Sequence, residues 1–238
     1  QSGGHYDWLR SAFRHYLKGG AGATEALRWA MSSARHRATT DQIWANAGNG
    51  FTPWIERYEK NDHGEGASSN PNGASTHTWN WGLLLAAAVT GDPWIREAAT
   101  HTADGIWYAS GGTSVFRNDL GNAEVRAMGW PLLVMTTAAR ELNDPKYWTK
   151  AKEIAANWVR LELRDGAQGY VKAWDRAYRQ VGASSPFQYG YSSLGLLYFA
   201  EEAMRRSDIP TGYTEMLTRM IAWLARPMPD GAYFPPIF

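Results

Sequence analysis

The length, charge and cysteine content of the chain exclude several classes of protein. Its 238 residues carry a net charge of only +1, so no strong field draws it to nucleic acid or to an anionic membrane surface. It has no cysteine, which excludes disulfides and thiolate metal sites, and no apolar run long enough to span a bilayer. Its 13 tryptophans and 12 tyrosines suit a core, but flat amphipathic rings also suit a sugar-binding surface.

Helical periodicity dominates the chain. Apolar residues recur at three- and four-residue spacing, as in Ile154, Ala155, Trp158 and Val159. In chain order, the predicted helices span 6–18, 24–38, 77–90, 93–108, 123–142, 145–163, 189–206 and 210–225. Only 169–181 has strand character, and it predicts a short hairpin. The sequence therefore predicts an all-α protein with long loops, either one domain over 1–238 or part of a larger protein.

The helices repeat in pairs. Asp92-Pro93 and Asp144-Pro145 lie 52 residues apart, and each precedes a tryptophan and an Ala-rich helix; Asp208 with Pro210 is a looser third copy. Aspartate caps a helix N-terminus, and proline fits the first turn. A period of this size predicts about four antiparallel helical hairpins, stacked as an open array or a closed ring.

The loops alternate in length. Turns within a hairpin are tight, whereas the connections 39–76, 109–122 and 164–188 are long. In an antiparallel array, the long connections and the starts of the odd-numbered helices share one end, where free N–H groups favour an anionic ligand. We therefore expect a functional rim there, formed by His5, Tyr6, Asp7, His77, Trp79, Asn80, Glu124, Arg126, Trp130, Tyr189 and Tyr191.

The stretch from Ser75, "STHTWNWGLLLAAAVTGDPWIREAA", resembles a known class of domain. Together with two further hairpins over about 77–225, it is similar to the α/α-toroid domains of polysaccharide lyases and glycoside hydrolases. The nearest likeness is the exo-acting rhamnogalacturonan lyase-like (YetA-like) group. Such rings usually hold more hairpins than the four counted here. This chain is therefore expected to be an open or incomplete toroid, a fragment, or an array that another chain or domain completes.

The resemblance implies an enzyme that cleaves a uronate-containing polysaccharide by β-elimination. That reaction needs a base, an acid for the leaving oxygen, and groups that hold the carboxylate. His77 is a candidate base, and Tyr189 or Tyr191 a candidate base or acid. The expected carboxylate-binding residues are Arg126, Asn72 and Asn80, and the expected sugar-stacking residues are Trp79, Trp81 and Trp130.

Two alternatives stay open. A glycoside hydrolase would need two carboxyl groups, and the candidates on the loop side are Asp62, Glu65, Asp119, Glu124 and Asp175, with Glu124 best placed. A non-catalytic helical-repeat module would bind glycan or protein through the same aromatic rim.

The sequence also bears on cofactors, compartment and a basic segment. No metal-ligand spacing or phosphate-binding loop appears, so no cofactor or metal is expected. The sequence does not fix the cellular compartment, although degradation of a polysaccharide would suit a secreted or cell-envelope protein. The basic stretch 32–40 predicts a helix end.

Overall fold

The computed structural model describes residues 7–41, 79–110, 126–164 and 186–224, and every regular element in these ranges is helical. The prediction of an all-α protein built from helix pairs is therefore confirmed for the described residues. The helices are α1 (Trp8–Lys18), α2 (Ala23–His36), α3 (Trp81–Thr90), α4 (Pro93–Ala109), α5 (Arg126–Glu141), α6 (Pro145–Arg164), α7 (Pro186–Arg206) and α8 (Tyr213–Leu224). A π-helical turn, η2 (Arg37–Asp41), extends α2. The predicted hairpin at 169–181 lies outside the described residues.

Local sequence explains the turns inside the second and third hairpins. Gly91 ends α3 in the left-handed conformation, and the Asp92 carboxylate then accepts hydrogen bonds from the first backbone N–H groups of α4. Asn143 adopts the same left-handed conformation before Asp144, whose carboxylate accepts from the N–H of Lys146. Both aspartates are caps, as predicted.

Asp208, in the looser third copy of the repeat, plays a different part from the other two aspartates. Its carboxylate accepts a hydrogen bond from Trp148 Nε1 at 2.8 Å and pairs with Lys152 Nζ at 2.9 Å, both on α6. Helix α8 begins only at Tyr213, after Gly212 with a positive φ. Asp208 lies further from the start of its helix than Asp92 and Asp144 do, so its side chain binds α6 and connects the α7–α8 turn to that helix.

Two hydrophobic clusters hold the hairpins together. The first joins α1, α2, α3 and the first half of α4 around Leu9, Phe13 and Leu83. The second joins the end of α4 to α5, α6, α7 and α8 around Trp158 and Phe199. Helix α4 contributes to both clusters and so links them.

Helices α5 and α7 run in parallel and in very close contact. A Cβ atom at Gly195 of α7 would lie 2.2 Å from the carbonyl oxygen of Gly129, near the start of α5. Further along, Arg206 of α7 donates a hydrogen bond to the carbonyl of Ala139 at 3.1 Å. Only glycine allows the two backbones to approach so closely.

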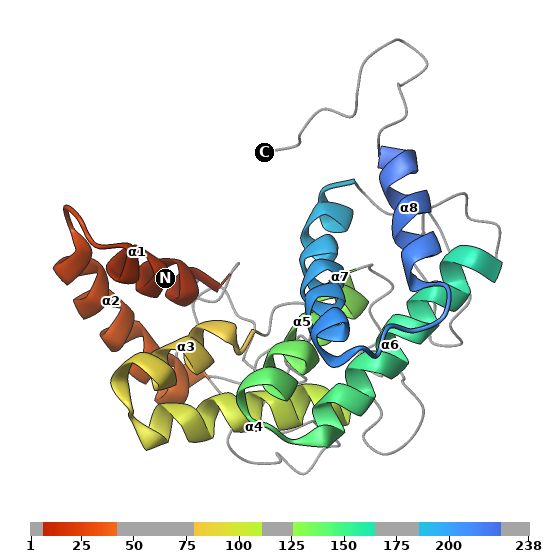
Figure 1. Cartoon of the computed structure of the whole chain (residues 1–238). Coiled ribbons are helices and arrows are strands. Elements are labelled where there is room, and N and C mark those ends of the chain that lie inside the picture. Colours follow the sequence, from red (N-terminus) through yellow and green to blue (C-terminus); the bar gives the residue numbers. More distant parts are fainter. Residues whose placement is uncertain (1–6, 42–78, 111–125, 165–185, 225–238) are drawn as a thin grey trace, which may run out of the picture.

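The described helices form an open arc (Figure 1). The α1–α2 hairpin lies at one end and α8 at the other, with α3, α4, α5 and α6 between them. Helices α1 and α8 lie far apart, and the first and fourth hairpins meet through a hydrogen bond from Arg10 of α1 to Tyr198 of α7. In the part of the chain that the structure describes, no helix is long and apolar enough to cross a membrane.

Candidate functional site

The starts of α1 and α3 meet through Asp7. Its carboxylate Oδ2 accepts a hydrogen bond from the backbone N–H of Gly82, in the first turn of α3, at 2.8 Å. Asp7 adopts the left-handed conformation, which aspartate tolerates better than most residues. A residue 75 positions away in the sequence therefore supplies the carboxylate that caps α3.

Arg37 lies beside this cap, and its side chain is only 2% exposed. Its Nη1 pairs with Asp7 Oδ1 at 3.2 Å, and its Nη2 donates to the carbonyl of Trp79 at 2.7 Å. The π-helical turn after α2 carries Arg37 into the interior. The basic stretch was expected only to end a helix. It does so, but it also supplies the buried cation that joins α1, α2 and α3.

Two tryptophans form the apolar centre of the site. The rings of Trp79 and Trp130 meet edge to face, with centroids 5.4 Å apart, and Leu133 completes the cluster. Trp79 is 2% exposed and Trp130 is 4% exposed. Their burial leaves neither ring with an open face for a sugar in this conformation. They join the start of α3 to the first turns of α5.

Asn80 is fully buried against the same helix. Its Oδ1 accepts a hydrogen bond from Thr137 Oγ1 of α5 at 3.0 Å, whereas its Nδ2 has no hydrogen-bond partner among the described residues. Asn80 was predicted to bind substrate. In the structure it attaches the N-terminus of α3 to the middle of α5.

The start of α7 reaches the same cluster through glycine. A Cβ at Gly129 would lie 2.6 Å from Ser192 Cα, so α7 passes directly beside the residue that precedes Trp130. The N-terminal parts of α3, α5 and α7 are thus adjacent, as the hairpin pattern predicts.

Arg10, Trp81 and Tyr198 form a half-buried layer next to the cluster. The guanidinium carbon of Arg10 lies 2.9 Å from the centroid of the Trp81 ring, and Arg10 Nη2 donates to the Tyr198 hydroxyl at 3.1 Å. Tyr198 also packs against Trp81 at a 72° interplanar angle, with centroids 4.4 Å apart. Burial lowers the pKa of Arg10 from its ordinary value.

The other predicted site residues are described only in part or not at all. Arg126 opens α5, and Tyr189 and Tyr191 belong to the first turns of α7, but their side chains are not described. The residues outside the described ranges are His5, Tyr6, Asn72, His77 and Glu124, and also the hydrolase candidates Asp62, Glu65, Asp119 and Asp175.

The site includes three residues that the sequence did not assign to it: Arg10, Arg37 and Tyr198. Arg10 and Arg14 lie one turn apart in the first helix, and in the sequence this spacing indicates only a solvated helix face. Tyr198 lies in the apolar run of α7 and is indistinguishable there from a core residue. Chain order gives no signal for such pairs, because they form only when the hairpins pack.

The described part of the site offers mainly hydrogen-bond donors and aromatic rings. The carboxylate of this site belongs to Asp7, and its two oxygens accept hydrogen bonds from Arg37 and from the N–H of Gly82. Among the described residues, no three His, Asp or Glu side chains gather as a metal site would require. Such surroundings suit an anionic group better than a cation.

Comparison with known proteins identifies no relative: no family model, no curated protein and no solved structure matches the chain.

Proposed function

We propose that this protein binds a uronate-containing polysaccharide where its odd-numbered helices begin, and cleaves it by β-elimination. The observation that carries the proposal is the convergence of α3, α5 and α7 on the Trp79–Trp130 pair, with α1 attached through Asp7. Four distant segments, each bearing predicted catalytic or binding residues, thereby share one region.

Chain connectivity supports a common location for the chemical groups. His77 precedes Trp79 by only two residues in the chain. Arg126 lies one helical turn before Trp130, a rise of about 6 Å along α5. Tyr191 immediately precedes Ser192, which touches Gly129.

In the proposed reaction, a base removes the proton from C5 of the uronate. The electron pair of the C5–H bond becomes the C4–C5 double bond, and the C4–O bond breaks. The leaving oxygen then takes a proton from an acid. His77 is proposed as the base and Tyr191 or Tyr189 as the acid, with Arg126 stabilising the carboxylate as negative charge builds on it.

The test is incubation with uronate-containing polysaccharides, monitored by the ultraviolet absorbance of the unsaturated product. Wild-type protein should generate this absorbance, and His77→Ala and Tyr191→Phe should each reduce the rate by about 100-fold or more. His15→Ala and Tyr16→Phe are matched controls, because both residues lie near the far end of α1. Both controls should retain the wild-type rate.

Other outcomes point to the alternatives. Reducing ends without the absorbance would indicate hydrolysis, for which Glu124→Gln becomes the next variant. Binding without any cleavage would indicate a glycan-binding module. An undiminished rate in His77→Ala would contradict the assignment of the base.

A further inference from the structure

The Arg10 guanidinium has hydrogen-bonding capacity that the protein does not use. A guanidinium carries five N–H bonds, and one of those of Arg10 reaches the Tyr198 hydroxyl. The others have no acceptor in the part of the chain that the structure describes. The Tyr198 hydroxyl accepts from Arg10, so its own hydrogen is also available to an acceptor.

Arg10 forms no ion pair with a carboxylate among the described residues. Asp7 lies near enough to act on Arg10 electrostatically, but its two oxygens bond to Arg37 and to the N–H of Gly82. Arg14, one turn further along α1, adds a second positive charge that repels Arg10. By contrast, the covered guanidinium groups of Arg37 and Arg206 each bind a carboxylate.

Trp81 prepares the guanidinium for binding. The cation–π contact with the indole holds the guanidinium in place and lowers the entropy that a ligand must remove. A planar, partly desolvated fork with a hydroxyl beside it matches the two oxygens of a carboxylate. A phosphate can also bind such a fork through two oxygens, so inorganic phosphate is one of the ligands tested.

We infer that Arg10, held by Trp81 and flanked by Tyr198, is a binding site for a carboxylate group. Because this inference rests on the proposed function, the carboxylate is assigned to a uronic acid unit of the polysaccharide. Arg10 then binds substrate from α1, in addition to the Arg126 expected on α5.

The experiment follows the Arg10 Nε–Hε signal by NMR in protein labelled with ¹⁵N-arginine. The signal is assigned by its loss in Arg10→Lys. The ligands are galacturonate, galactose, acetate and inorganic phosphate. Galacturonate should shift the Arg10 signal in a saturable way, whereas galactose, which lacks the carboxylate, should not.

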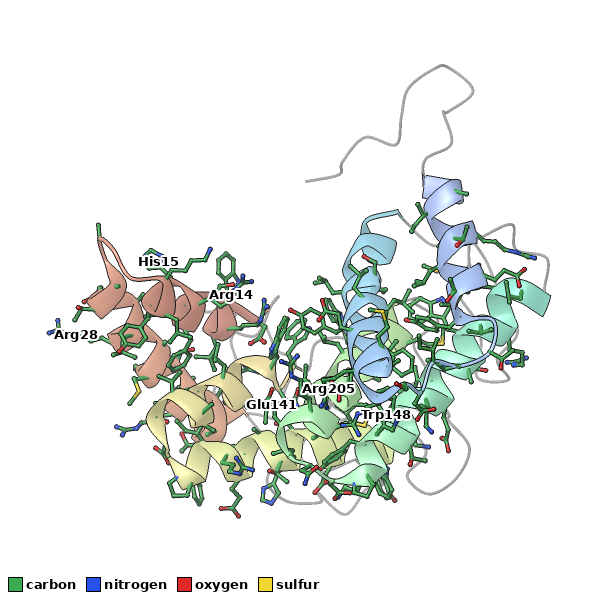
Figure 2. All side chains as sticks on the ribbon, in the orientation of Figure 1. Arg14, His15, Arg28, Glu141, Trp148 and Arg205 are labelled. Carbon is green, nitrogen blue, oxygen red and sulfur yellow. The ribbon has the colours of Figure 1, made fainter. Side chains whose placement is uncertain are left out.

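Two variants test the residues directly by calorimetric titration. Arg10→Lys should weaken galacturonate binding by about tenfold or more, because lysine lacks the planar fork. Tyr198→Phe, which keeps the ring against Trp81, should weaken it by about threefold to tenfold. Arg28→Lys is the matched control, since Arg28 is exposed on the outer side of α2 (Figure 2), and its affinity should equal that of wild type.

Several results would overturn the inference. Equal binding of galactose, equal binding of phosphate, or an unchanged affinity in a folded Arg10→Lys variant would each remove the carboxylate site. Acetate that binds as tightly as galacturonate would uphold the carboxylate site and overturn its assignment to a sugar.

The outcome is separable from that of the proposed function. Galacturonate binding at Arg10 without any unsaturated product would support the carboxylate site and contradict the proposed lyase activity. Product formation with an unchanged KM in Arg10→Lys would keep the lyase and remove the site.

Discussion

The buried pair of Asp7 and Arg37 gives the sharpest test of how the site is held together. Asp7→Asn keeps the size of the side chain and suits the left-handed backbone, because asparagine also tolerates that conformation. It removes the charge that neutralises Arg37. An asparagine also has one acceptor oxygen where the carboxylate has two, so its NH₂ group must face either Arg37 Nη1 or the N–H of Gly82.

The expected cost follows from burial. Arg37 is 2% exposed and Asp7 8% exposed, so water cannot replace the lost partner. Removing one member of a buried ion pair typically costs about 3–5 kcal/mol. Since Arg37 keeps its 2.7 Å hydrogen bond to the Trp79 carbonyl, we expect the lower end of that range, about 3 kcal/mol.

A matched control separates capping from charge burial. Asp92→Asn makes the same chemical change at the cap of α4, where asparagine and aspartate are about equally good caps. It should change the free energy of unfolding by less than about 0.5 kcal/mol. Both variants are compared with wild type by urea denaturation, followed by the circular dichroism of the helices.

The reasoning is refuted if Asp7→Asn is as mild as Asp92→Asn. A second check is Arg37→Met in both backgrounds. Arg37→Met should cost at least about 1.5 kcal/mol less in the Asp7→Asn variant than in wild type, because the ion pair between Asp7 and Arg37 is then already absent. Equal costs in the two backgrounds would show that the pair is not coupled.

Two further predictions concern α7: one tests its packing against α5, and the other tests an ion pair within the helix. Gly195→Ala should destabilise the protein by about 1–3 kcal/mol. The new Cβ would lie 2.2 Å from the Gly129 carbonyl oxygen, so α5 and α7 must move apart. An unfolding temperature equal to that of wild type would contradict this prediction. The hydrogen bonds from Arg205 and then Arg206 lower the pKa of the Glu202 carboxyl, so its stabilisation is full above the unfolded pKa of about 4.3 and is lost as the pH falls through the lower folded value. Glu202→Gln should therefore cost about 1 kcal/mol at pH 7 and progressively less as the pH falls through the folded pKa. Urea denaturation at each pH measures the difference, and a difference that stays constant with pH would exclude the linkage.

Much of the fold could be predicted from local patterns. The eight predicted helices match the observed ones within a few residues at each end. The Asp-Pro starts of α4 and α6 were found because capping and proline geometry act over one turn of chain. The third hairpin repeat is present as α7 and α8, but its Asp208 bonds to α6 and does not cap α8, which chain order does not indicate.

The site was less predictable. Trp79, Trp130 and Asn80 belong to the place where the helices converge, as expected, but they are buried and join helices there. A tryptophan at a helix start is equally suited to stack on a sugar or to pack against another ring. Which of these occurs depends on how far the neighbouring helix lies from the tryptophan, and the sequence does not give that distance.

The sequence by itself determined the helices, their turns and their alternation, because periodicity, caps and glycine conformations act between residues close in the chain. Only the tertiary structure decided that Asp7 caps α3, that Arg37 is buried against it, and that Arg10 meets Tyr198 across 188 residues. These contacts arise from how the hairpins pack, and the close approach of α5 and α7 at Gly129 and Gly195 is one part of that packing. Contacts across such separations depend on the angles and distances between whole helices, which no local pattern encodes.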